Sequence, residues 1–546
     1  MGLHQNDMPL RWPLWYTAMN CIVPGVCSST LQPKSPMIKS RYRIWLARWA
    51  IIAACTLPQA VVAQEPYPGF DAYVIKSMQT SKVPGVAVAI VRNDSVLYVK
   101  GYGVLAAGSR TPVNAQTLFE IGSSSKAFTA TAVAMMVSDG KMRFDDLIAK
   151  YLPDFKLSDP VASSQVTIRD ALEHRSGIGR GELLWLDAGT SREDVLHRVR
   201  FLKPESFFRS RWSYQNIMYL AVGEAAGKAA GSTWDELIQQ RIFTPLGMTS
   251  SVPTDRGLTN TNFATPHTIE HDTVQVRRHF NAENIAPAGA IISCAQDMAQ
   301  WLRFQLNDGV VGGKRLLSSA ALRETHLPQM LIGAGGPGVS EQTLFNAYGM
   351  GWIVQDFRHE LVWQHGGNTP GMTTAVGMLP EKKFGVVVLS NMDHTQLSDL
   401  LMRYVFDRHL SAPVRDYIAE AVVRASAQRR PSDTTTAPPH VKAVLPLPLS
   451  AYVGTFADSL YGEATVSVQD GHLEFVHGLQ HGPLAYWNAN NFRWSSNGSL
   501  VGSNDPLAII KFEVSADNRV TGVYYGLAPD VTLLGRKVAG GGRGGD

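Results

Sequence analysis

Ser123 and Lys126 are the two residues whose types and spacing most clearly suggest chemistry in this sequence. They lie three positions apart at the predicted start of a helix, and residues at this spacing share one helix face. A serine hydroxyl needs a base within hydrogen-bond reach to act as a nucleophile, and a lysine amine can serve once its pKa is lowered. For an isolated match, a helix-capping serine followed by a solvent-exposed lysine is the simpler interpretation.

Two further short motifs could complete such a site. Tyr214 and Asn216 offer a phenol and a carboxamide two residues apart, and His365 precedes a pair of glycines at the edge of a β-rich segment. Each motif is expected about once by chance from composition. Taken singly, Tyr214 reads as a half-buried aromatic, Asn216 as a helix cap and His365 as a turn residue. Their order, from helix start to helical region to sheet edge, is much rarer by chance, so we expect them to form one site.

The elements around these motifs predict a sheet built from both ends of one domain. Strand patterns at Val83–Val91 and Ser95–Val99 flank the turn pair Asn93-Asp94 and indicate a hairpin. After a mostly helical middle region, strand patterns return at Gly351–Gln355, Leu361–Trp363, Thr373–Met378 and Gly385–Ser390. First and last strands that enclose a helical region imply an antiparallel sheet with helices packed against it.

Several helices are predicted from apolar periodicity and stop signals. The apolar and small residues after Ser123 continue to Gly140 and indicate a buried helix. The other clear helical segments are Phe70–Gln79, Trp234–Phe243, Ala295–Gln305 and an amphipathic stretch around Leu397–His409.

The pattern changes after residue 410. A helix and a linker rich in Pro and Thr, which contains Pro431–Pro439, occupy residues 411–445. Residues 446–537 then show short alternating runs separated by turn pairs, as is typical of a small all-β barrel or sandwich. The runs are Ala464–Val468, Leu473–Val476, Phe492–Trp494, Ile509–Val514 and Val520–Tyr525. The glycine-rich tail, residues 538–546, is expected to be disordered.

Residues 1–63 are interpreted as an N-terminal extension and a signal peptide. Basic residues precede the apolar segment Trp49–Leu57, and small residues end at Ala63, where cleavage is expected. An uncleaved membrane anchor is less favoured because the apolar run is shorter than the ~20 residues that span a bilayer, so we expect no membrane span in the mature chain. The protein should be exported, periplasmic or secreted. A lipoprotein cleavage box ending at Cys55, which would add a lipid anchor there, is the alternative.

Charge and cysteine content narrow the function classes. The net charge of +4 arises mainly from residues 1–63, which hold six basic side chains against one Asp, so no nucleic-acid partner is expected. Of the four cysteines, only Cys294 follows Ala63, which leaves no pair for a disulfide or a cysteine zinc site. His359, Glu360 and His365 are not at metal-ligand spacing and are interpreted as scattered surface residues. A GxGxxG match at Gly333–Gly338 lacks the flanking strand and helix and is interpreted as a surface loop.

Several motifs together resemble one family, the penicillin-recognising serine hydrolases. The closest branch is related to class C β-lactamases and also holds D-alanyl-D-alanine carboxypeptidases, D-aminopeptidases and esterases. The resemblance covers residues 66–410. Besides the three site motifs it rests on Gly140–Leu147, Tyr151–Pro153, Leu172–Gly177, Pro245–Met248, Ala288-Gly289 with Asp297, Tyr348–Trp352 and Leu389–Asn391. It implies an α/β (α+β) fold of the β-lactamase/transpeptidase type, with a helical subdomain. The C-terminal β domain resembles the lipocalin-like barrel of some peptidases in this branch.

The resemblance implies a serine hydrolase that works through an acyl-enzyme and needs no metal or organic cofactor. Ser123 would attack a carbonyl carbon, and Lys126 would either accept its proton or lower the pKa of Tyr214. Which of these two side chains is the base stays open at this stage.

The remaining motif residues would bind substrate. Asn216 would hold the substrate amide, and His365 would orient the substrate or polarise the Tyr214 hydroxyl as a base near neutral pH. The main-chain N–H groups of Ser123 and Asn368, beside Gly366 and Gly367, would form the oxyanion hole.

The third motif ranks the candidate activities. Family members often have Lys-Thr-Gly there, whereas His365–Gly367 resembles the aminopeptidase and esterase members. A peptidase or amidase acting on small peptides is therefore placed first, a carboxylesterase second and a β-lactamase third. An acylatable sensor without turnover is the alternative from another class, and a small molecule or peptide is the expected partner. The sequence does not predict an oligomeric state.

Overall fold

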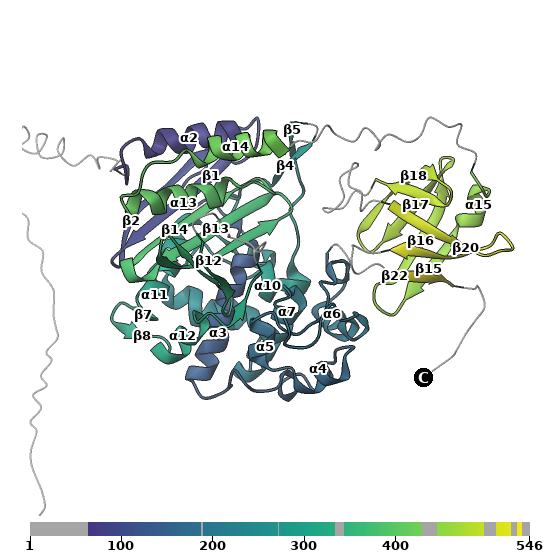
Figure 1. Cartoon of the computed structure of the whole chain (residues 1–546), viewed down its shortest axis with the longest axis horizontal. Coiled ribbons are helices and arrows are strands. Elements are labelled where there is room, and N and C mark those ends of the chain that lie inside the picture. Colours follow the sequence, from purple (N-terminus) through teal and green to yellow (C-terminus); the bar gives the residue numbers. More distant parts are fainter. Residues whose placement is uncertain are drawn as a thin grey trace, which may run out of the picture. The chain divides into compact units, whose positions relative to one another are not determined.

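The computed structural model describes residues 64–186, 189–270, 272–333, 343–428, 445–495, 509–525 and 532–537. The chain divides into residues 1–62 and 63–546, and the described residues all belong to the second unit. The predicted signal peptide, the Pro431–Pro439 linker, most of the Gly333–Gly338 segment and the glycine-rich tail lie outside the described residues. Two bodies are described below, a sheet covered by helices and a closed β-barrel (Figure 1).

One eight-stranded antiparallel sheet joins the two ends of the larger body. Strand β1 (Gly85–Arg92) pairs with β2 (Ser95–Gly103) on one side and with β14 (Phe384–Ser390) on the other. The sheet continues through β13 (Met372–Leu379), β12 (Glu360–Thr369), β11 (Ile353–Phe357), β10 (Asn346–Tyr348) and β9 (Met330–Leu331). Asn93 and Asp94 both have positive φ angles, as the predicted two-residue hairpin turn requires. The predicted pairing of first and last strands is confirmed.

Helices cover both faces of the sheet because its central strands are apolar on both sides. Alternate side chains of β1 point to opposite faces. Val86, Val88 and Ile90 pack in one core with α2 (Phe70–Ser81) and α13 (Leu397–His409), on the side where α14 (Tyr417–Gln428) also lies (Figure 1). Ala87, Ala89 and Val91 pack in the other core with α3 (Ser125–Ser138) and α11 (Ala295–Leu306).

The central helices form the side of the fold that carries the candidate site. Helix α3 is buried along most of its length, as predicted, and ends before Gly140, whose φ is 72°. It packs on α7 (Asn216–Ala230) and α10 (Ala286–Gly289). The other helices are α4 (Pro160–Gln165), α5 (Ile168–Leu172), α6 (Arg192–Arg198), α8 (Trp234–Ile238), α9 (Thr244–Leu246) and α12 (Ser319–Thr325).

One predicted helix changes type partway. The segment Trp234–Phe243 is α-helical only as α8 and then widens into a π-helical turn, η5 (Gln239–Phe243). The widening precedes Pro245, which has no N–H to donate to the carbonyl group of Arg241 as a continuous α-helix would require.

Three short ladders accompany the main sheet. The first joins β3 (Phe119–Glu120) to β6 (Ile292–Ser293), directly before the segment of Ser123. The others join β4 (His267–Glu270) to β5 (Thr273–Val276) and β7 (Val310–Val311) to β8 (Lys314–Arg315). The sequence patterns did not predict these two- to four-residue strands, because so few residues show no period.

The smaller body is a closed antiparallel barrel of eight strands preceded by α15 (Leu449–Tyr452). The strands are β15 (Gly454–Asp458), β16 (Gly462–Gln469), β17 (His472–His477), β18 (Gln480–Asn488), β19 (Asn491–Trp494), β20 (Ile509–Val514), β21 (Val520–Tyr525) and β22 (Thr532–Arg536). Side chains such as Phe475, Trp494 and Phe512 fill its core. The all-β prediction is confirmed in its barrel form, while β15, β18 and β22 were not predicted.

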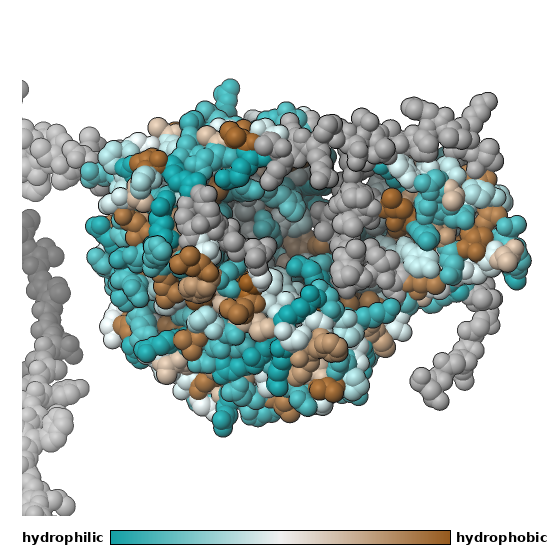
Figure 2. Space-filling model, in the orientation of Figure 1, coloured by the Kyte–Doolittle hydropathy of each residue, from teal (hydrophilic) through white to brown (hydrophobic). Residues whose placement is uncertain are grey.

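The visible face of the larger body is mainly hydrophilic, and its hydrophobic residues form small groups (Figure 2). Within the described ranges, no helix combines the length and the apolar character needed to cross a bilayer.

Candidate active site

Ser123 lies in η1 (Gly122–Ser124), a tight 3-10 turn between β3 and α3. The β3–β6 ladder holds the turn on one side. On the other side, the hydroxyl group of Ser124 donates to the main-chain oxygen of His365 in β12, at 3.2 Å. Because both ends of the turn are fixed, the half-buried Ser123 side chain has a defined position facing a cleft.

Two glycines allow the turn to lie directly against β12. Gly122 has a φ of 50°, and a methyl group added to it would lie 2.9 Å from the main-chain nitrogen of Asn368. A methyl group on Gly367 would overlap the carbonyl oxygen of Ile121. Only glycine fits these positions. The close approach places the main-chain nitrogen of Asn368 beside the Ser123 turn, where an oxyanion hole would need it.

Lys126 is fully buried, and its Nζ atom contacts three oxygen atoms. They are Ser123 Oγ at 3.0 Å, Asn216 Oδ1 at 2.8 Å and the main-chain oxygen of Ala288 at 2.8 Å. The amide and peptide oxygens can only accept hydrogen bonds, whereas the serine hydroxyl can also donate. A neutral Lys126 amine can therefore donate to Asn216 and Ala288 and accept from Ser123. This is the geometry of a general base beside its nucleophile.

The surroundings of Lys126 favour the neutral amine. Burial lowers the pKa of Lys126 well below its usual value, and the positive charge of Arg180 lowers it further, while Glu182 opposes the change. The lowered pKa thus favours the same neutral amine that the hydrogen-bond contacts of Lys126 require if it is to accept from Ser123.

Tyr214 lies two residues before Asn216, which begins α7 after the capping residue Gln215. Its ring faces the Lys126 amine and the Arg180 guanidinium group, with Lys126 Nζ at 4.7 Å and the guanidinium carbon at 5.3 Å from the ring centroid. Burial raises the pKa of Tyr214, although its hydrogen bond with Ser123 and the charge of Arg180 lower it. The phenol is therefore protonated at neutral pH, which makes it a proton donor and disfavours it as the resting base.

His365 is buried within β12 and contacts Tyr348 through its ring. Its Nδ1 lies 2.6 Å from the carbonyl oxygen of Gly366, and its Nε2 lies 2.9 Å from the Tyr348 hydroxyl. Since a carbonyl oxygen only accepts, Nδ1 carries the proton and Nε2 accepts from Tyr348.

The charge state of His365 corrects one prediction. Burial lowers the pKa of His365 to about 3. The prediction that His365 acts as a base near neutral pH is therefore wrong, because an imidazole with so low a pKa does not take up a proton at that pH. The side-chain hydrogen bond of His365 is also with Tyr348 and not with Tyr214, whose ring centroid lies 6.3 Å from that of His365.

A cleft of about 620 Å³ opens over Ser123, within the usual range for small-molecule sites. Its lining comprises Ser123, Arg180, Glu182, Trp185, Leu186, Trp212, Tyr214, Asn216, Phe280, Tyr348, Ile353, His365, Gly366, Asn368, Thr369, Pro370 and His394. Of the predicted site residues, only Lys126 and Gly367 do not line it, because they lie behind Ser123 and against the 121–123 turn. The structure thus brings all predicted residues together.

Arg180 and Glu182 are site residues that the sequence patterns did not reveal. Arg180 Nε donates to Glu182 Oε1 at 2.6 Å, and Glu182 also forms a hydrogen bond with Asn216. Both follow the Leu172–Gly177 segment of the family resemblance closely, which was the only available signal. The aromatic walls Trp185, Trp212 and Phe280 carried no signal, since isolated aromatic residues are common in cores.

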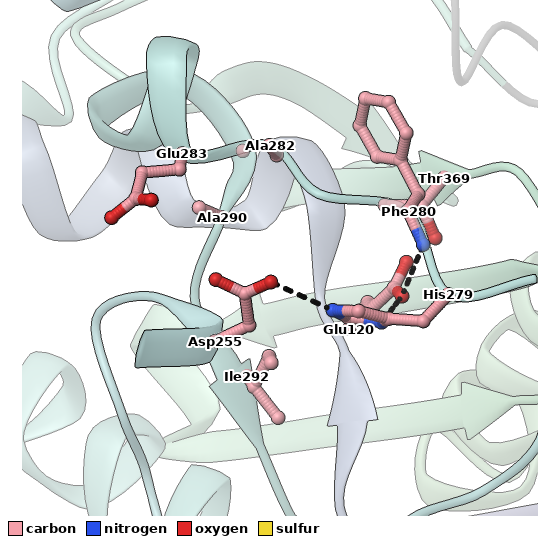
Figure 3. A pocket seen from close by; sticks show the side chains of 10 residues that line it. Glu120, Asp255, His279, Phe280, Ala282, Glu283, Ala290, Ile292 and Thr369 are labelled. Atoms are coloured by element: carbon pink, nitrogen blue, oxygen red, sulfur yellow. Dashed lines mark hydrogen bonds and ion pairs between the residues drawn. The ribbon is translucent and has the colours of Figure 1, made fainter. Parts of the chain in front are cut away.

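A second, smaller pocket adjoins the cleft and holds a histidine between two carboxylates (Figure 3). His279 Nδ1 lies 2.6 Å from Glu120 Oε1, and His279 Nε2 lies 3.3 Å from Asp255 Oδ2. The Phe280 N–H donates to the same Glu120 oxygen at 3.4 Å. We call His279, Glu120 and Asp255 the His279 clasp. It joins the Phe280 wall of the cleft to the strand that precedes Ser123.

The clasp histidine is cationic at neutral pH. Burial lowers the pKa of His279, but the interactions with Asp255 and Glu120 outweigh this effect and raise the pKa to about 9. Glu283 also lines the pocket and forms an ion pair with Arg256.

Comparison with known proteins adds relatives for both bodies. A family model described as Beta-lactamase matches residues 70–408, and one described as a domain of unknown function (DUF3471) matches residues 438–539. The unguisins hydrolase ungD of Aspergillus violaceofuscus is 27% identical over 447 residues, which are 74% of this chain and 77% of that protein. Protein flp of Staphylococcus aureus is 24% identical over 61% of this chain and 64% of that protein.

Among solved structures, the octameric penicillin-binding protein homologue from Pyrococcus abyssi has a similar fold. The TM-score is 0.56 at 19% sequence identity, and the match covers 86% of this chain and 98% of that chain.

Proposed function

The chain belongs to the Beta-lactamase family, and we propose that it is a serine hydrolase that cleaves amide bonds of small peptides through an acyl-enzyme. The observation that carries the proposal is the set of contacts made by the buried Lys126, whose Nζ lies 3.0 Å from Ser123 Oγ. Lys126 is neutral under conditions in which an exposed lysine is charged, because burial lowers its pKa.

In the first step, Ser123 Oγ bonds to the substrate carbonyl carbon while Lys126 takes the hydroxyl proton. The carbonyl π electrons move to the oxygen, which the main-chain N–H groups of Ser123 and Asn368 stabilise. Losing one such donor typically costs about 3 kcal/mol of transition-state stabilisation.

In the second step, the carbon–nitrogen bond breaks and the leaving nitrogen takes a proton. Tyr214 is suited to deliver it, since its hydroxyl is protonated and hydrogen-bonded with Ser123. The proton held by Lys126 then restores the phenol. Water then attacks the acyl carbon while its proton passes to the neutral Lys126; the bond to Ser123 Oγ breaks, Lys126 returns the proton to Oγ, and the carboxylic acid leaves.

The cleft supports a peptide as substrate. Asn216, which lines the cleft, would hold a substrate amide, and Trp185, Trp212 and Phe280 provide apolar walls. The third motif supplies the neutral His365, whereas a lysine at this place would supply a fixed cation. Because His365 does not supply this cation, we rank a β-lactam below peptides as a substrate. A carboxylic ester is the second candidate substrate.

A substrate panel tests the proposal. We expect aminoacyl p-nitroanilides of D or L configuration to turn over, with slower or no hydrolysis of a chromogenic cephalosporin. Turnover should vanish in S123A, which lacks the nucleophile. Ester hydrolysis without any amide turnover would assign a carboxylesterase, and one stable adduct per chain without product release would assign an acylatable sensor. Either result would overturn the proposal.

A further inference from the structure

His174 is a buried histidine beside Tyr214 to which the proposed mechanism gives no task. It follows helix α5, its side chain is fully buried, and its φ angle is 58°. Residues with a Cβ atom adopt this left-handed conformation at a cost. Surrounding contacts must therefore hold it there.

The contacts of His174 lie on both sides of Tyr214. The main-chain oxygen of His174 accepts a hydrogen bond from the Ser213 N–H at 2.7 Å. Its ring atom Nδ1 accepts another from the Gln215 N–H at 3.1 Å. One residue thus fixes the Trp212–Ser213 peptide group, one residue ahead of Tyr214, and the peptide group directly after Tyr214. The left-handed backbone brings both of its acceptors to the same three-residue segment.

The ring of His174 also packs against the aromatic side chains of the site. Its centroid lies 4.4 Å from that of Tyr214, 4.6 Å from Tyr348 and 5.0 Å from Tyr219. Because Nδ1 accepts a hydrogen bond from a peptide N–H, the ring proton is on Nε2 and the ring is neutral. Burial lowers the pKa of His174 well below its usual value, in agreement with this tautomer.

We propose that His174 is a positioning residue that holds the Tyr214 hydroxyl at Ser123 by fixing the main chain on both sides of Tyr214. The inference rests on the proposed function, in which Tyr214 protonates the leaving nitrogen. A purely structural histidine would need only its ring volume in the core. The acceptor at Nδ1 is the feature that the positioning role requires in addition.

Two substitutions isolate this acceptor. His174→Asn places Oδ1 where Nδ1 stands, and asparagine tolerates positive φ. His174→Gly tolerates the same backbone but has no side-chain acceptor. Both variants lose the ring, so the difference between them reports mainly the hydrogen bond to Gln215.

The test compares a p-nitroanilide of a dipeptide with a p-nitrophenyl ester of the same acyl group, for the wild-type enzyme, H174N, H174G and Y214F. Amine departure needs a proton, whereas p-nitrophenolate leaves without one. We expect H174G to lose about tenfold more kcat on the amide than H174N, because small displacements of catalytic groups cost one to two orders of magnitude. Ester turnover should differ by less than about threefold between the two.

The reference variant Y214F separates the possible failures. Y214F should also lose kcat selectively on the amide. Equal losses of kcat on amide and ester in Y214F would refute the proposed role of Tyr214 and the inference with it. If Y214F loses amide turnover selectively but H174G and H174N are equal, or H174G loses both substrates equally, His174 is only a packing residue. Thermal unfolding of all four proteins identifies a variant that fails to fold. If H174N folds and H174G does not, the acceptor serves the stability of the fold, which would also contradict the inference.

Discussion

Two histidines, the buried His174 and the half-buried His279, contact the elements around Ser123, and their surroundings shift their pKa values in opposite directions. His174 contacts Tyr214 without a carboxylate partner, and its pKa is lowered well below the usual value. His279 lies between Glu120 and Asp255, and its pKa is raised to about 9. Burial alone would lower both values. The carboxylates of Glu120 and Asp255 therefore account for the raised pKa of His279.

This contrast separates two tasks within one short segment, Glu120–Lys126. At its start, Glu120 supplies a counter-charge, and the resulting ion pairs hold the wall of the cleft. At its end, Lys126 contacts neutral oxygen atoms, so it can gain and lose a proton. Fixed charges suit a structural clasp, whereas poorly compensated, buried groups suit proton transfer.

Removing the base should have the largest effect. Lys126→Met keeps the buried side-chain volume but has no amine, so acylation of Ser123 should slow by about 10³-fold, within the range found for general bases. The measurement is pre-steady-state release of p-nitrophenol from an activated ester. Acylation by K126M within tenfold of the wild-type rate would show that Lys126 is not the base.

Removing the clasp charge should affect stability and leave the chemistry mostly intact. His279→Gln should lower the free energy of unfolding by on the order of 2 kcal/mol near pH 6, since one pKa unit corresponds to about 1.4 kcal/mol and the side chain keeps partial access to water. A group whose pKa is raised in the folded state stabilises fully below its unfolded pKa of about 6.5. This stabilisation should disappear as the pH rises through about 9.

Denaturant unfolding of the wild-type protein and H279Q from pH 6 to pH 10 measures this difference. The gap between the two proteins should close at alkaline pH. A gap that is constant over this range would show that His279 acts by packing and not by charge.

The charges around Lys126 should shift the pH dependence of activity by a smaller amount. Activity needs the neutral amine, so kcat/KM should rise with pH through the lowered pKa of Lys126. Arg180→Met should move this rise to higher pH and Glu182→Gln to lower pH, each by about one unit, because Arg180 lowers and Glu182 raises the pKa of Lys126. A pH–rate profile of each variant tests the directions, and shifts of the same sign in both would contradict the electrostatic explanation.

Some parts of the site and of the fold could be predicted from the sequence alone. Ser123 with Lys126, and Tyr214 with Asn216, were predictable because residue types and short spacings carry their chemistry. The sheet that joins both chain ends was predictable because its strands have clear apolar runs.

The pKa shifts and the supporting residues were not predictable in the same way. The neutral state of His365 depends on burial beside Lys126, which is 239 positions away along the chain. Glu120 and His279 are likewise brought together only by the fold. His174 was visible within a family-like motif, but its task depends on a positive φ angle that no residue type announces.

The central claim, that Ser123 carries the acyl group and Lys126 activates it, is tested most directly by trapping the intermediate. The protein is mixed with an activated peptide ester, quenched in acid within milliseconds to seconds, and analysed by intact mass and peptide mapping. We predict one acyl group per chain, attached to Ser123, with the adduct absent in S123A and formed about 10³-fold more slowly in K126M. An adduct on another residue, or full-rate acylation of K126M, would contradict the account.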